Sequence, residues 1–330
     1  MCGLAGFLTK TSLKSNSEDL LRKMGRSLVH RGPDDDGVWM DPAAGVGLAH
    51  QRLSVIDLSS EGRQPMISAS GRYVITYNGE IYNFLELRKN LDQTEDSHWR
   101  GHSDTEVILA SIEKWGLPQA LKKFNGMFAF ALWDREMQTL TLARDRIGIK
   151  PLYYGWMGAT FLFGSELKAL KAHPEFEGRV DRESLSLLMR FNYIPAPRSI
   201  YQNVFKLQPG MFLTVKAGEM DSSPTTYWSF EETARQGVQD GFDGTREEAV
   251  DQLDSLLGSA VKLQMASDVP LGAFLSGGID SSTIAALMQK QSPQAIKTFS
   301  IGFEEKGFDE APYARRVAKH LGTDHTEHYV

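Results

Sequence analysis

Cysteine is almost absent from the sequence: Cys2 is the single one among 330 residues. A chain with one cysteine cannot build an internal disulfide framework, and this content is typical of a reducing compartment. Residues 1–10 hold an apolar stretch with no basic segment before it, and they are too short for a signal peptide. The densest apolar run, residues 126–133, is less than half of the ~20 residues that span a bilayer. We therefore expect a cytoplasmic protein that is not embedded in a membrane.

An excess of positive charge is also missing. The chain has 36 Lys and Arg residues against 42 Asp and Glu residues, which gives a formal net charge of −6. Nucleic-acid and anionic-membrane binding depend largely on positive charge, so we expect no nucleic-acid partner and no polybasic membrane patch. Hydrophobic residues make up 41% and charged residues 24% of the chain, which is ordinary for globular proteins. At roughly 150 residues per domain, the length favours two domains.

Residues 1–212 are predicted to form the first domain, in which short apolar strands alternate with helices. The run 73–77 is a predicted strand that stops at the turn dipeptide Asn78-Gly79. Segments 127–133 and 139–143 are predicted to form a hairpin, and the first is apolar on both faces, as in a strand that is covered on both sides. Strands that arrive in hairpins between helices indicate an α+β domain with antiparallel sheets and helical layers.

Two capping-box patterns predict where helices begin. Ser103 is followed three positions later by Glu106, and Thr245 by Glu248. In such a box the hydroxyl accepts a hydrogen bond from the backbone of the third residue, and the carboxylate of that residue reaches back to the cap. We therefore expect one helix directly after Ser103 and another directly after Thr245.

Composition and pattern change after residue 212. Residues 213–244 are rich in Gly, Ser, Thr and Asp and show little periodicity, so we interpret them as a linker. Residues 245–330 then follow a strand–loop–helix order that indicates a parallel, doubly wound α/β sheet. Three strands are too few for a complete sheet of this kind, so we expect these residues to be the truncated beginning of a domain. The predicted elements are strands 269–275, 296–301 and 325–330 and helices 281–290 and 309–321.

Cys2 is a candidate nucleophile. A cysteine attacks as a thiolate, and a thiol with an unperturbed pKa of ~8.5 needs a base near neutral pH. Removal of Met1 would make Cys2 the N-terminal residue, and its own α-amine, with a pKa of ~7.7–8.0, could be that base. The alternative is a small buried residue that happens to occupy position 2.

Three groups of residues could support such a nucleophile. Asn78 and Gly79 offer a side-chain amide and a backbone N–H to a developing oxyanion. Arg52 suits the carboxylate of an amino-acid substrate, and Asp104 with Glu80 suits its ammonium group. Each also has an ordinary structural interpretation: a hairpin turn, a surface charge and a helix cap, respectively.

Six motifs in this region resemble, in the same order, those of the N-terminal-nucleophile glutaminase domain, above all in glutamine-hydrolysing asparagine synthetases. The resemblance implies a four-layer αββα fold, with Cys2 as nucleophile and Asn78 and Gly79 as the oxyanion hole. The motifs are 1–6 (MCGLAG), 30–34 (HRGPD), 51–54 (QRLS), 78–83 (NGEIYN), 103–106 (SDTE) and 144–154 (RDRIGIKPLYY). The implied glutamine-binding set is Arg52, Leu53, Val55, Asn78, Glu80 and Asp104.

A second site is predicted at residues 276–282 (SGGIDSS), which follow an apolar strand and open a helix. The glycines let backbone N–H groups form an anion-binding nest, the hydroxyls add donors, and the helix N-terminus adds positive charge. The loop lacks the Gly-Lys-Ser/Thr ending of a Walker loop. It resembles the pyrophosphate-binding loop of ATP pyrophosphatases, which implies ATP and Mg²⁺. The implied ATP-binding set is Leu275, Ser276, Gly277, Gly278, Asp280, Ser281, Ser282 and Ile301.

No protein-held metal site is expected. Residues 34–36 are three aspartates after Gly32-Pro33, and a solvated turn explains them. His320, His325 and His328 do not have a convincing tetrahedral ligand spacing. Residues 267–270 and 308–325 also resemble asparagine synthetases, except that the family often has two adjacent histidines where His325 is followed by a threonine. We treat that position as structural.

The combined resemblance implies an asparagine synthetase, a glutamine-dependent carbon–nitrogen ligase. Cys2 hydrolyses L-glutamine to glutamate and ammonia, ATP activates the side-chain carboxylate of L-aspartate as an acyl-adenylate, and ammonia, carried through an internal tunnel, gives L-asparagine, AMP and pyrophosphate. Three alternatives stay open. The acceptor could be another carboxylate, in a sugar acid or a peptide; the chain could be a glutaminase-only or non-catalytic fragment; or it could be a β-lactam-forming synthetase, which would not need Cys2. The resemblance also suggests a homodimer.

Overall fold

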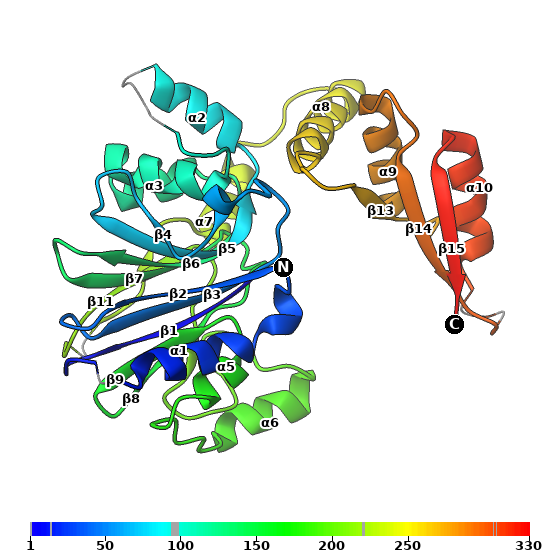
Figure 1. Ribbon diagram of the computed structural model, residues 1–330. Coiled ribbons are helices and arrows are strands. Elements are labelled where there is room, and N and C mark those ends of the chain that lie inside the picture. The colour runs from blue at the N-terminus through cyan, green and yellow to red at the C-terminus, as the bar shows by residue number, and fades with distance from the viewer. Residues whose placement is uncertain (1, 14, 94–98, 220–221, 306, 308) are drawn as a thin grey trace. The chain divides into compact units, whose positions relative to one another are not determined.

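The computed structural model describes residues 2–13, 15–93, 99–219, 222–305, 307 and 309–330. Met1 and Phe308, which belong to two of the motifs above, lie outside the described residues. The chain divides into two compact units, Met1–Gln239 and Asp240–Val330 (Figure 1). Each unit is described by itself below.

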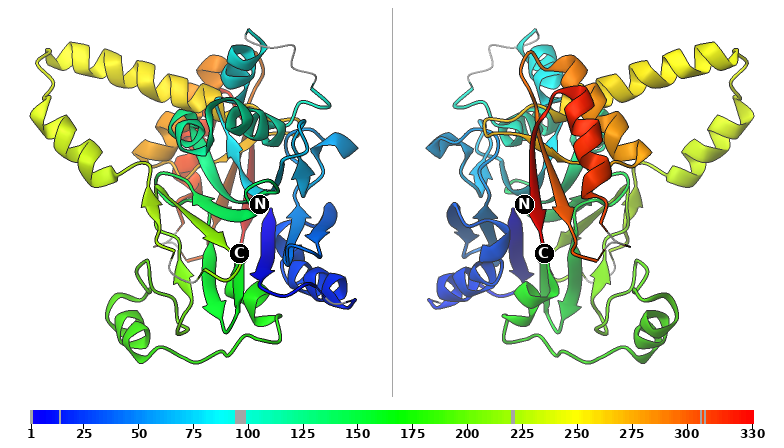
Figure 2. Two further views of the ribbon diagram at one scale, coloured as in Figure 1. Left: turned by 90° about the vertical axis from the view of Figure 1, so that its left-hand side faces the viewer. Right: turned by 90° about the vertical axis from the view of Figure 1, so that its right-hand side faces the viewer.

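Two six-stranded sheets lie face to face in the first unit, with the strand orders β10-β8-β9-β1-β3-β2 and β12-β11-β7-β6-β5-β4 (Figures 1 and 2). The strand pairs within both sheets are antiparallel. The first sheet consists of β1 (Gly3–Thr9), β2 (Asp35–Asp41), β3 (Val46–Arg52), β8 (Tyr153–Met157), β9 (Thr160–Gly164) and β10 (Phe205–Lys206). The second consists of β4 (Met66–Ile67), β5 (Tyr73–Ile81), β6 (Gly126–Asp134), β7 (Thr139–Arg144), β11 (Met211–Lys216) and β12 (Thr225–Thr226).

Helices cover the outer face of each sheet, so the expected four-layer αββα order is confirmed (Figure 1). On the first sheet, α1 (Ser17–Arg26) packs on β1 and β3, and α5 (Leu167–Lys171) packs on β9. On the second sheet, α3 (Asp104–Trp115) packs on β5 and is flanked by α2 (Phe84–Asp92) and α4 (Leu117–Lys123). The unit also holds α6 (Arg182–Phe191), α7 (Phe230–Gln239) and the short turns η1 (Val29–Arg31) and η2 (Ser60–Gly62).

The main core lies between the two sheets. Leu4 and Leu48 of the first sheet and Trp133 and Leu142 of the second belong to one cluster of fully buried side chains. Strand β6 is buried on both faces along most of its length, because one face meets this core and the other lies under the helices. The predicted hairpin of two-sided apolar character is therefore confirmed, with β6 and β7 as its strands.

The turn expected at Asn78-Gly79 is wrong, because β5 continues through this dipeptide to Ile81. In the ladder Asn78 pairs with Ala129, and Gly79 pairs with Phe128. A Cβ atom at position 79 would lie 2.2 Å from the carbonyl oxygen of Met127 and 2.7 Å from the Cα atom of Phe128. The glycine therefore permits a close approach of two strands and does not serve a turn.

The structure also differs from the linker expected at 213–244. Strand β11 runs on to Lys216, with Leu213 and Val215 buried in the core between the sheets. Strand β12 pairs with β11, and α7 continues to Gln239 within the first unit. Composition misled the prediction here, because two alternating apolar residues are enough to anchor a strand to an existing sheet.

The second unit contains a three-stranded parallel sheet in the order β13-β14-β15, which confirms the beginning of a parallel α/β sheet. Its strands are β13 (Gly272–Phe274), β14 (Lys297–Gly302) and β15 (Asp324–Tyr329), and its helices are α8 (Arg246–Gln264), α9 (Ile279–Gln291) and α10 (Ala311–Leu321). Apolar side chains of α8, α9 and α10 form a separate small core. Among the helices of the described residues, none combines the length and apolarity that crossing a membrane requires.

Candidate active site

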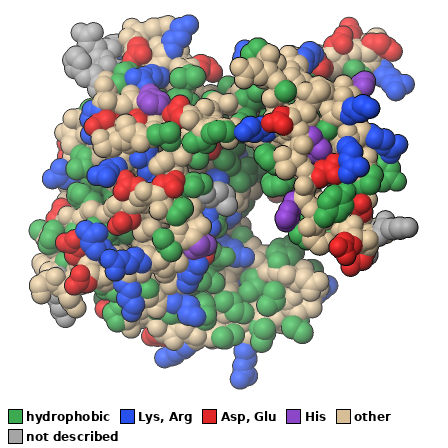
Figure 3. Space-filling model, turned by 45° about the vertical axis from the view of Figure 1, so that its right-hand side comes forward, with side chains coloured by type: hydrophobic (Ala, Val, Ile, Leu, Met, Phe, Trp, Pro, Cys, Tyr) green, Lys and Arg blue, Asp and Glu red, His purple; other side chains and the backbone are tan. Residues whose placement is uncertain are grey.

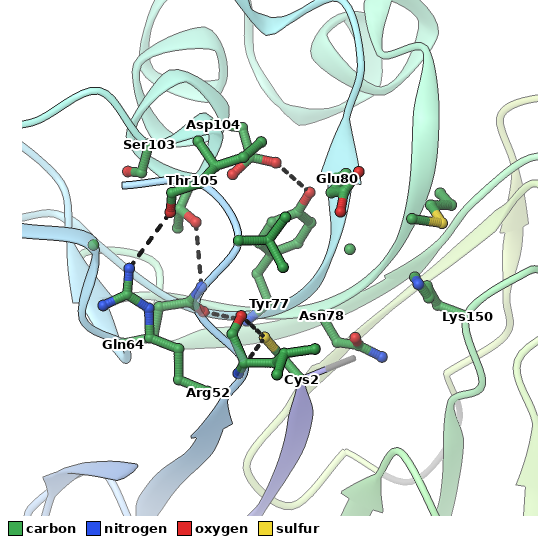
Figure 4. A pocket seen from close by; sticks show the side chains of 16 residues that line it. Cys2, Arg52, Gln64, Tyr77, Asn78, Glu80, Ser103, Asp104, Thr105 and Lys150 are labelled. Carbon is green, nitrogen blue, oxygen red and sulfur yellow. Dashed lines mark hydrogen bonds between the residues drawn. The ribbon is translucent and has the colours of Figure 1, made fainter. Parts of the chain in front are cut away.

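One pocket of the first unit gathers residues that are far apart in the sequence. Cys2 enters it directly before β1, Arg52 ends β3, Asn78 belongs to β5, and Asp104 begins α3 (Figure 4). All residues of the predicted nucleophile, oxyanion and glutamine sets line it: Cys2, Arg52, Leu53, Val55, Asn78, Gly79, Glu80 and Asp104. The structure therefore brings the whole first set together.

Cys2 is held by the backbone of Leu53. The Leu53 N–H donates to the sulfur over 3.4 Å, and the thiol lies 3.6 Å from the Leu53 carbonyl oxygen. Burial raises the pKa of the Cys2 thiol, and the hydrogen bond from Leu53 only partly offsets this effect. The resting sulfur is therefore a thiol, and its attack on a substrate requires a nearby base.

Asn78 carries an unusual buried amide. Its side chain is 1% exposed, and among the described residues neither its oxygen nor its nitrogen has a hydrogen-bond partner. An unsatisfied buried polar group costs about 1–3 kcal/mol, so such groups are rare unless a ligand completes them. In Figure 4 this side chain lies beside Cys2, where its amide N–H can meet an oxyanion.

Arg52 brings a buried positive charge to the pocket. Its side chain is only 6% exposed, so the surface-charge interpretation is wrong. The guanidinium donates to backbone carbonyl oxygens of Ser59 at 3.1 Å, Ile56 at 3.5 Å and Asp57. No carboxylate of the described residues forms an ion pair with it, so this cation has neutral partners and can accept an anion.

Two carboxylates face the same pocket. Asp104 accepts hydrogen bonds from the Tyr77 hydroxyl at 2.7 Å and from the Ile81 N–H at 2.9 Å. Burial raises the pKa of Asp104 despite these bonds. Burial also raises the pKa of Glu80, and the negative charge of Asp104 raises it further. A nearby cation stabilises the ionised forms of two carboxyl groups whose pKa values are raised. An ammonium group would therefore bind favourably beside them.

Lys150 is a pocket residue that the sequence analysis did not single out. It is 2% exposed, and in Figure 4 its side chain points toward the pocket. Burial lowers the pKa of Lys150, and the charge of Glu80 opposes that shift. Its loop is fixed by Asp145, whose carboxylate accepts from the backbone N–H of Lys150 at 3.0 Å. The motif 144–154 was the one sequence feature that could have indicated Lys150, because it contains both Asp145 and Lys150.

Gln64 is a further pocket residue, and it connects two elements of the pocket wall. Gln64 accepts from the Tyr77 N–H at 2.7 Å and donates to the Thr105 hydroxyl at 3.2 Å, so it ties β5 to α3. No sequence pattern indicates Gln64, because its partners Tyr77 and Thr105 are 13 and 41 positions away along the chain. The remaining lining residues not predicted are Ile56, Gly62, Tyr77, Ser103, Thr105 and Met127.

The second unit holds a pocket at the loop 276–282. Four members of the predicted ATP set line it: Leu275, Ser276, Ser281 and Ile301. The other four, Gly277, Gly278, Asp280 and Ser282, belong to the loop and the first turn of α9 but do not line this pocket. The structure therefore brings half of the second set to one cavity and leaves the rest beside it in the chain.

The backbone of this loop needs glycine. Gly277 has φ +81°, and a Cβ atom there would lie 2.7 Å from the backbone nitrogen of Ala314. The Ser276 and Ser281 hydroxyls lie 2.9 Å apart. The buried hydroxyl oxygen of Ser282 has no hydrogen-bond partner among the described residues. A glycine nest, an unpaired hydroxyl and the start of α9 fit a phosphate ligand.

No group of three or more His, Cys, Asp and Glu side chains in the described part of the chain could hold a metal ion. His325 instead pairs its Nδ1 atom with the Thr298 hydroxyl at 2.9 Å. On the faces that Figure 3 shows, Lys and Arg side chains are interspersed with Asp and Glu side chains, and neither sign gathers in one large patch.

Comparison with known families gives two matches along the chain. Residues 1–228 match the family described as glutamine amidotransferase domain, and residues 252–330 match the family described as asparagine synthase. The first match covers all residues of the pocket that contains Cys2. The second begins within α8 and includes the loop 276–282.

Curated relatives extend over both units. A protein named putative asparagine synthetase [glutamine-hydrolyzing] 2, from Methanocaldococcus jannaschii, is 36% identical over 100% of this chain and 65% of its own length. Asparagine synthetase [glutamine-hydrolyzing] 1 from Bacillus subtilis is 38% identical over 98% of this chain and 49% of its own length. The chain thus spans about half to two thirds of the length of these relatives.

A solved structure supports the fold. The glutamine phosphoribosylpyrophosphate amidotransferase of B. subtilis aligns with 99% of this chain and 65% of its own, with a TM-score of 0.51 and 15% sequence identity. At this identity the likeness concerns the fold alone.

Proposed function

The chain belongs to the glutamine amidotransferase family and continues into the beginning of an asparagine synthase domain, and from this premise we propose that its protein is a glutamine-hydrolysing asparagine synthetase. The proposed reaction converts L-glutamine, L-aspartate and ATP into L-glutamate, L-asparagine, AMP and pyrophosphate. The observation that carries the proposal is the pocket in which Cys2, the unpaired Asn78 amide and the buried charges of Arg52 and Asp104 meet.

The first half-reaction is the hydrolysis of glutamine. With Met1 removed, the α-amine of Cys2 takes the thiol proton, and the sulfur attacks the side-chain amide carbon of glutamine. The Asn78 amide and the Gly79 N–H stabilise the oxyanion, and the C–N bond breaks as the nitrogen receives a proton and leaves as ammonia. Water then hydrolyses the thioester, which releases glutamate and restores the thiol.

Substrate binding in this pocket uses charges of both signs. Arg52 pairs with the α-carboxylate of glutamine, because its present partners are neutral carbonyl groups. Asp104 and Glu80 pair with the α-ammonium, whose charge favours their ionised forms. Leu53 and Val55 line the wall along the apolar part of the substrate.

The second half-reaction is proposed to use ATP with Mg²⁺ at the loop 276–282. ATP supplies the adenylyl group that activates the carboxylate acceptor. The N–H groups of Gly277 and Gly278 with the hydroxyls of Ser276, Ser281 and Ser282 bind the pyrophosphate, and Asp280 lies beside them in the first turn of α9. Leu275 and Ile301 line the same pocket and would contact the adenine or ribose. We further propose a cytoplasmic homodimer.

The acceptor is tested by pyrophosphate release from the full-length protein, given ATP, Mg²⁺ and an ammonium salt so that Cys2 is not needed. Release that depends on aspartate supports asparagine synthesis. Release with a sugar acid or a peptide carboxylate, but not with aspartate, would replace aspartate by that acceptor and keep the rest of the proposal.

The two-site proposal is tested by Cys2→Ala in the same protein. We expect glutamine-dependent synthesis to be lost and ammonia-dependent synthesis to be retained, because only the first half-reaction uses the sulfur. A matched control is Ser27→Ala, a hydroxyl that is bonded to the Met24 carbonyl at 2.7 Å and does not line the pocket. Loss of both activities in the Cys2 variant would contradict two separate sites.

A further inference from the structure

The proposed mechanism makes Cys2 the N-terminal residue, and the backbone at a chain terminus is usually poorly ordered. A nucleophile must nevertheless be held to within tenths of an ångström of its attack position, since a misplacement of ~1 Å can cost about 10²-fold in rate. The Cys2 sulfur contacts Leu53, but those contacts involve the side chain. The peptide group of Cys2 needs a restraint of its own.

Arg31 supplies that restraint. Its Nε atom donates to the Cys2 carbonyl oxygen at 3.0 Å. Arg31 is the last residue of η1, which begins directly after Leu28. Leu28 packs so closely on β1 that a Cβ atom at Gly3 would lie 2.8 Å from the Leu28 Cβ. The 28–31 segment therefore lies against the beginning of β1 and aims the guanidinium at Cys2.

The guanidinium is in turn fixed by Glu166. The Nη1 atom of Arg31 donates to the Glu166 carboxylate at 2.8 Å. The Arg31 side chain is only 10% exposed, so its charge needs a nearby partner of opposite sign. Because one guanidinium uses Nε for Cys2 and Nη1 for Glu166, the carboxylate sets the orientation of the group that touches Cys2.

The Glu166 carboxylate bonds to Arg31 and does not cap the helix that it precedes. Glu166 occupies the N-cap position of α5, yet within the described residues its side chain makes no capping hydrogen bond. His30 and Lys168 also approach the carboxylate, at 2.9 and 3.2 Å. Burial alone would raise the pKa of Glu166, but the hydrogen bonds from Arg31, His30 and Lys168 outweigh burial and lower it to about 2. The group is therefore ionised at all physiological pH values.

Ser165, which precedes Glu166, also bonds to the beginning of β1. The Leu4 N–H donates to the Ser165 hydroxyl at 3.0 Å, and the Ser165 N–H donates to the Leu4 carbonyl at 2.8 Å. Residues 165 and 166 thus hold the first residues of β1 through both backbone and side-chain bonds. Neither residue lines the pocket.

We propose that Glu166 is a positioning residue for the Cys2 nucleophile, acting through Arg31 on the Cys2 carbonyl. This inference rests on the proposed glutamine hydrolysis and adds to it a residue outside the pocket. It predicts a defect in the chemical step rather than in substrate binding, because Arg52 and Asp104 are fixed independently.

The test is Glu166→Gln in the full-length protein. We expect kcat for glutamine hydrolysis to fall about tenfold, which is a fraction of the rate loss from a ~1 Å displacement. The KM for glutamine should stay within about twofold, and ammonia-dependent synthesis should be unchanged. The matched control is Glu183→Gln, which removes another Arg–Glu pair of the first unit, at 2.7 Å from Arg198, on a side chain that is 75% exposed.

A double-mutant cycle separates positioning from general stability. Arg31→Lys keeps the charge but cannot donate to Cys2 and Glu166 from one planar group. If both residues act through one chain of contacts, the double variant has about the kcat of Arg31→Lys alone. Additive losses, an unchanged kcat in Glu166→Gln, or a parallel fall in ammonia-dependent synthesis would each overturn the inference. Absence of glutamine hydrolysis in the unsubstituted protein would instead overturn the proposed function.

Discussion

At the scale of single residues, Asn78 separates activity from stability. Its buried amide has no partner among the described residues, so the folded protein gains little from it. We predict that Asn78→Ala lowers kcat for glutamine hydrolysis roughly 10²–10³-fold, the usual effect of losing one oxyanion donor. The free energy of unfolding should not fall by more than about 1 kcal/mol, because the unsatisfied amide itself costs stability. Parallel kinetics and chemical denaturation measure both, and a large loss of stability with unchanged kcat would contradict the assignment.

Asp104 predicts how the reaction depends on pH. Burial raises its pKa above the ordinary 3.8, so the folded protein binds this proton more tightly than the unfolded chain does. The ionised form therefore destabilises the fold as pH rises above 3.8, and an ammonium ligand relieves this cost.

We therefore predict that the KM for glutamine rises as pH falls toward the raised pKa of Asp104, because the protonated form cannot pair with an ammonium group. Asp104→Asn should raise KM at neutral pH and flatten this dependence, which steady-state kinetics from pH 5 to 8 would measure. Glu61→Gln, outside the pocket, is the control. A KM that is independent of pH in the unsubstituted protein would argue against the carboxylate pair.

Pocket residues could be predicted from the sequence where the residue type itself indicates a chemical role. Cys2, Arg52 and Asp104 stood out because nucleophiles and charges in ordered motifs are visible in the sequence. The link from Cys2 through Arg31 to Glu166 was not, because 135 positions separate its two charged partners. Lys150 was missed for a similar reason, since its burial depends on how Asp145 folds the loop.

At the scale of elements, capping patterns predicted where helices begin, because the residues that form a cap are near one another in the sequence. Thr245 and Glu248 form the complete predicted capping box at the start of α8. Ser103 caps α3 as expected, but the Glu106 carboxylate accepts from the N–H groups of Arg100 and Gly101 and so does not complete the box. The backbone of the loop five and six residues before Glu106 thus redirected one of the four predicted capping groups.

The close approach of β5 and β6 gives a prediction at this scale. Gly79→Ala would place a methyl group 2.2 Å from the Met127 carbonyl oxygen. We expect a loss of about 1–3 kcal/mol in the free energy of unfolding, as for other overpacked sites. Chemical denaturation measures it against Gly237→Ala in α7, where no atom of the described residues outside the chain neighbours and the helix backbone lies within 4 Å of the new methyl group. Equal stability of the two variants would show that β5 shifts without cost.

At the scale of the whole molecule, two units carry two proposed half-reactions. The fold class followed from the sequence because hairpins and a strand–loop–helix order differ along the chain. The boundary did not, because β11 and α7 belong to the first unit although their composition is that of a linker.

The division of the chain into two units predicts that a substitution can abolish either half-reaction without affecting the other. Gly277→Ala forces a side chain into φ +81° and within 2.7 Å of the Ala314 nitrogen. We expect pyrophosphate release to fall roughly 10²-fold, with glutamine hydrolysis unchanged, which is the reverse of the Cys2→Ala pattern. Both activities can be assayed in one preparation of the full-length protein. A fall in glutamine hydrolysis of the same size would mean that the two units do not act separately.

The burial of Cys2 has a consequence beyond catalysis. Peroxide oxidises the thiolate form of cysteine to sulfenic acid, and burial holds this residue in the thiol form by raising its pKa. A resting enzyme of this kind would withstand oxidative stress better than one with an exposed, low-pKa cysteine, since the reactive sulfur is generated only when a base acts on it during turnover.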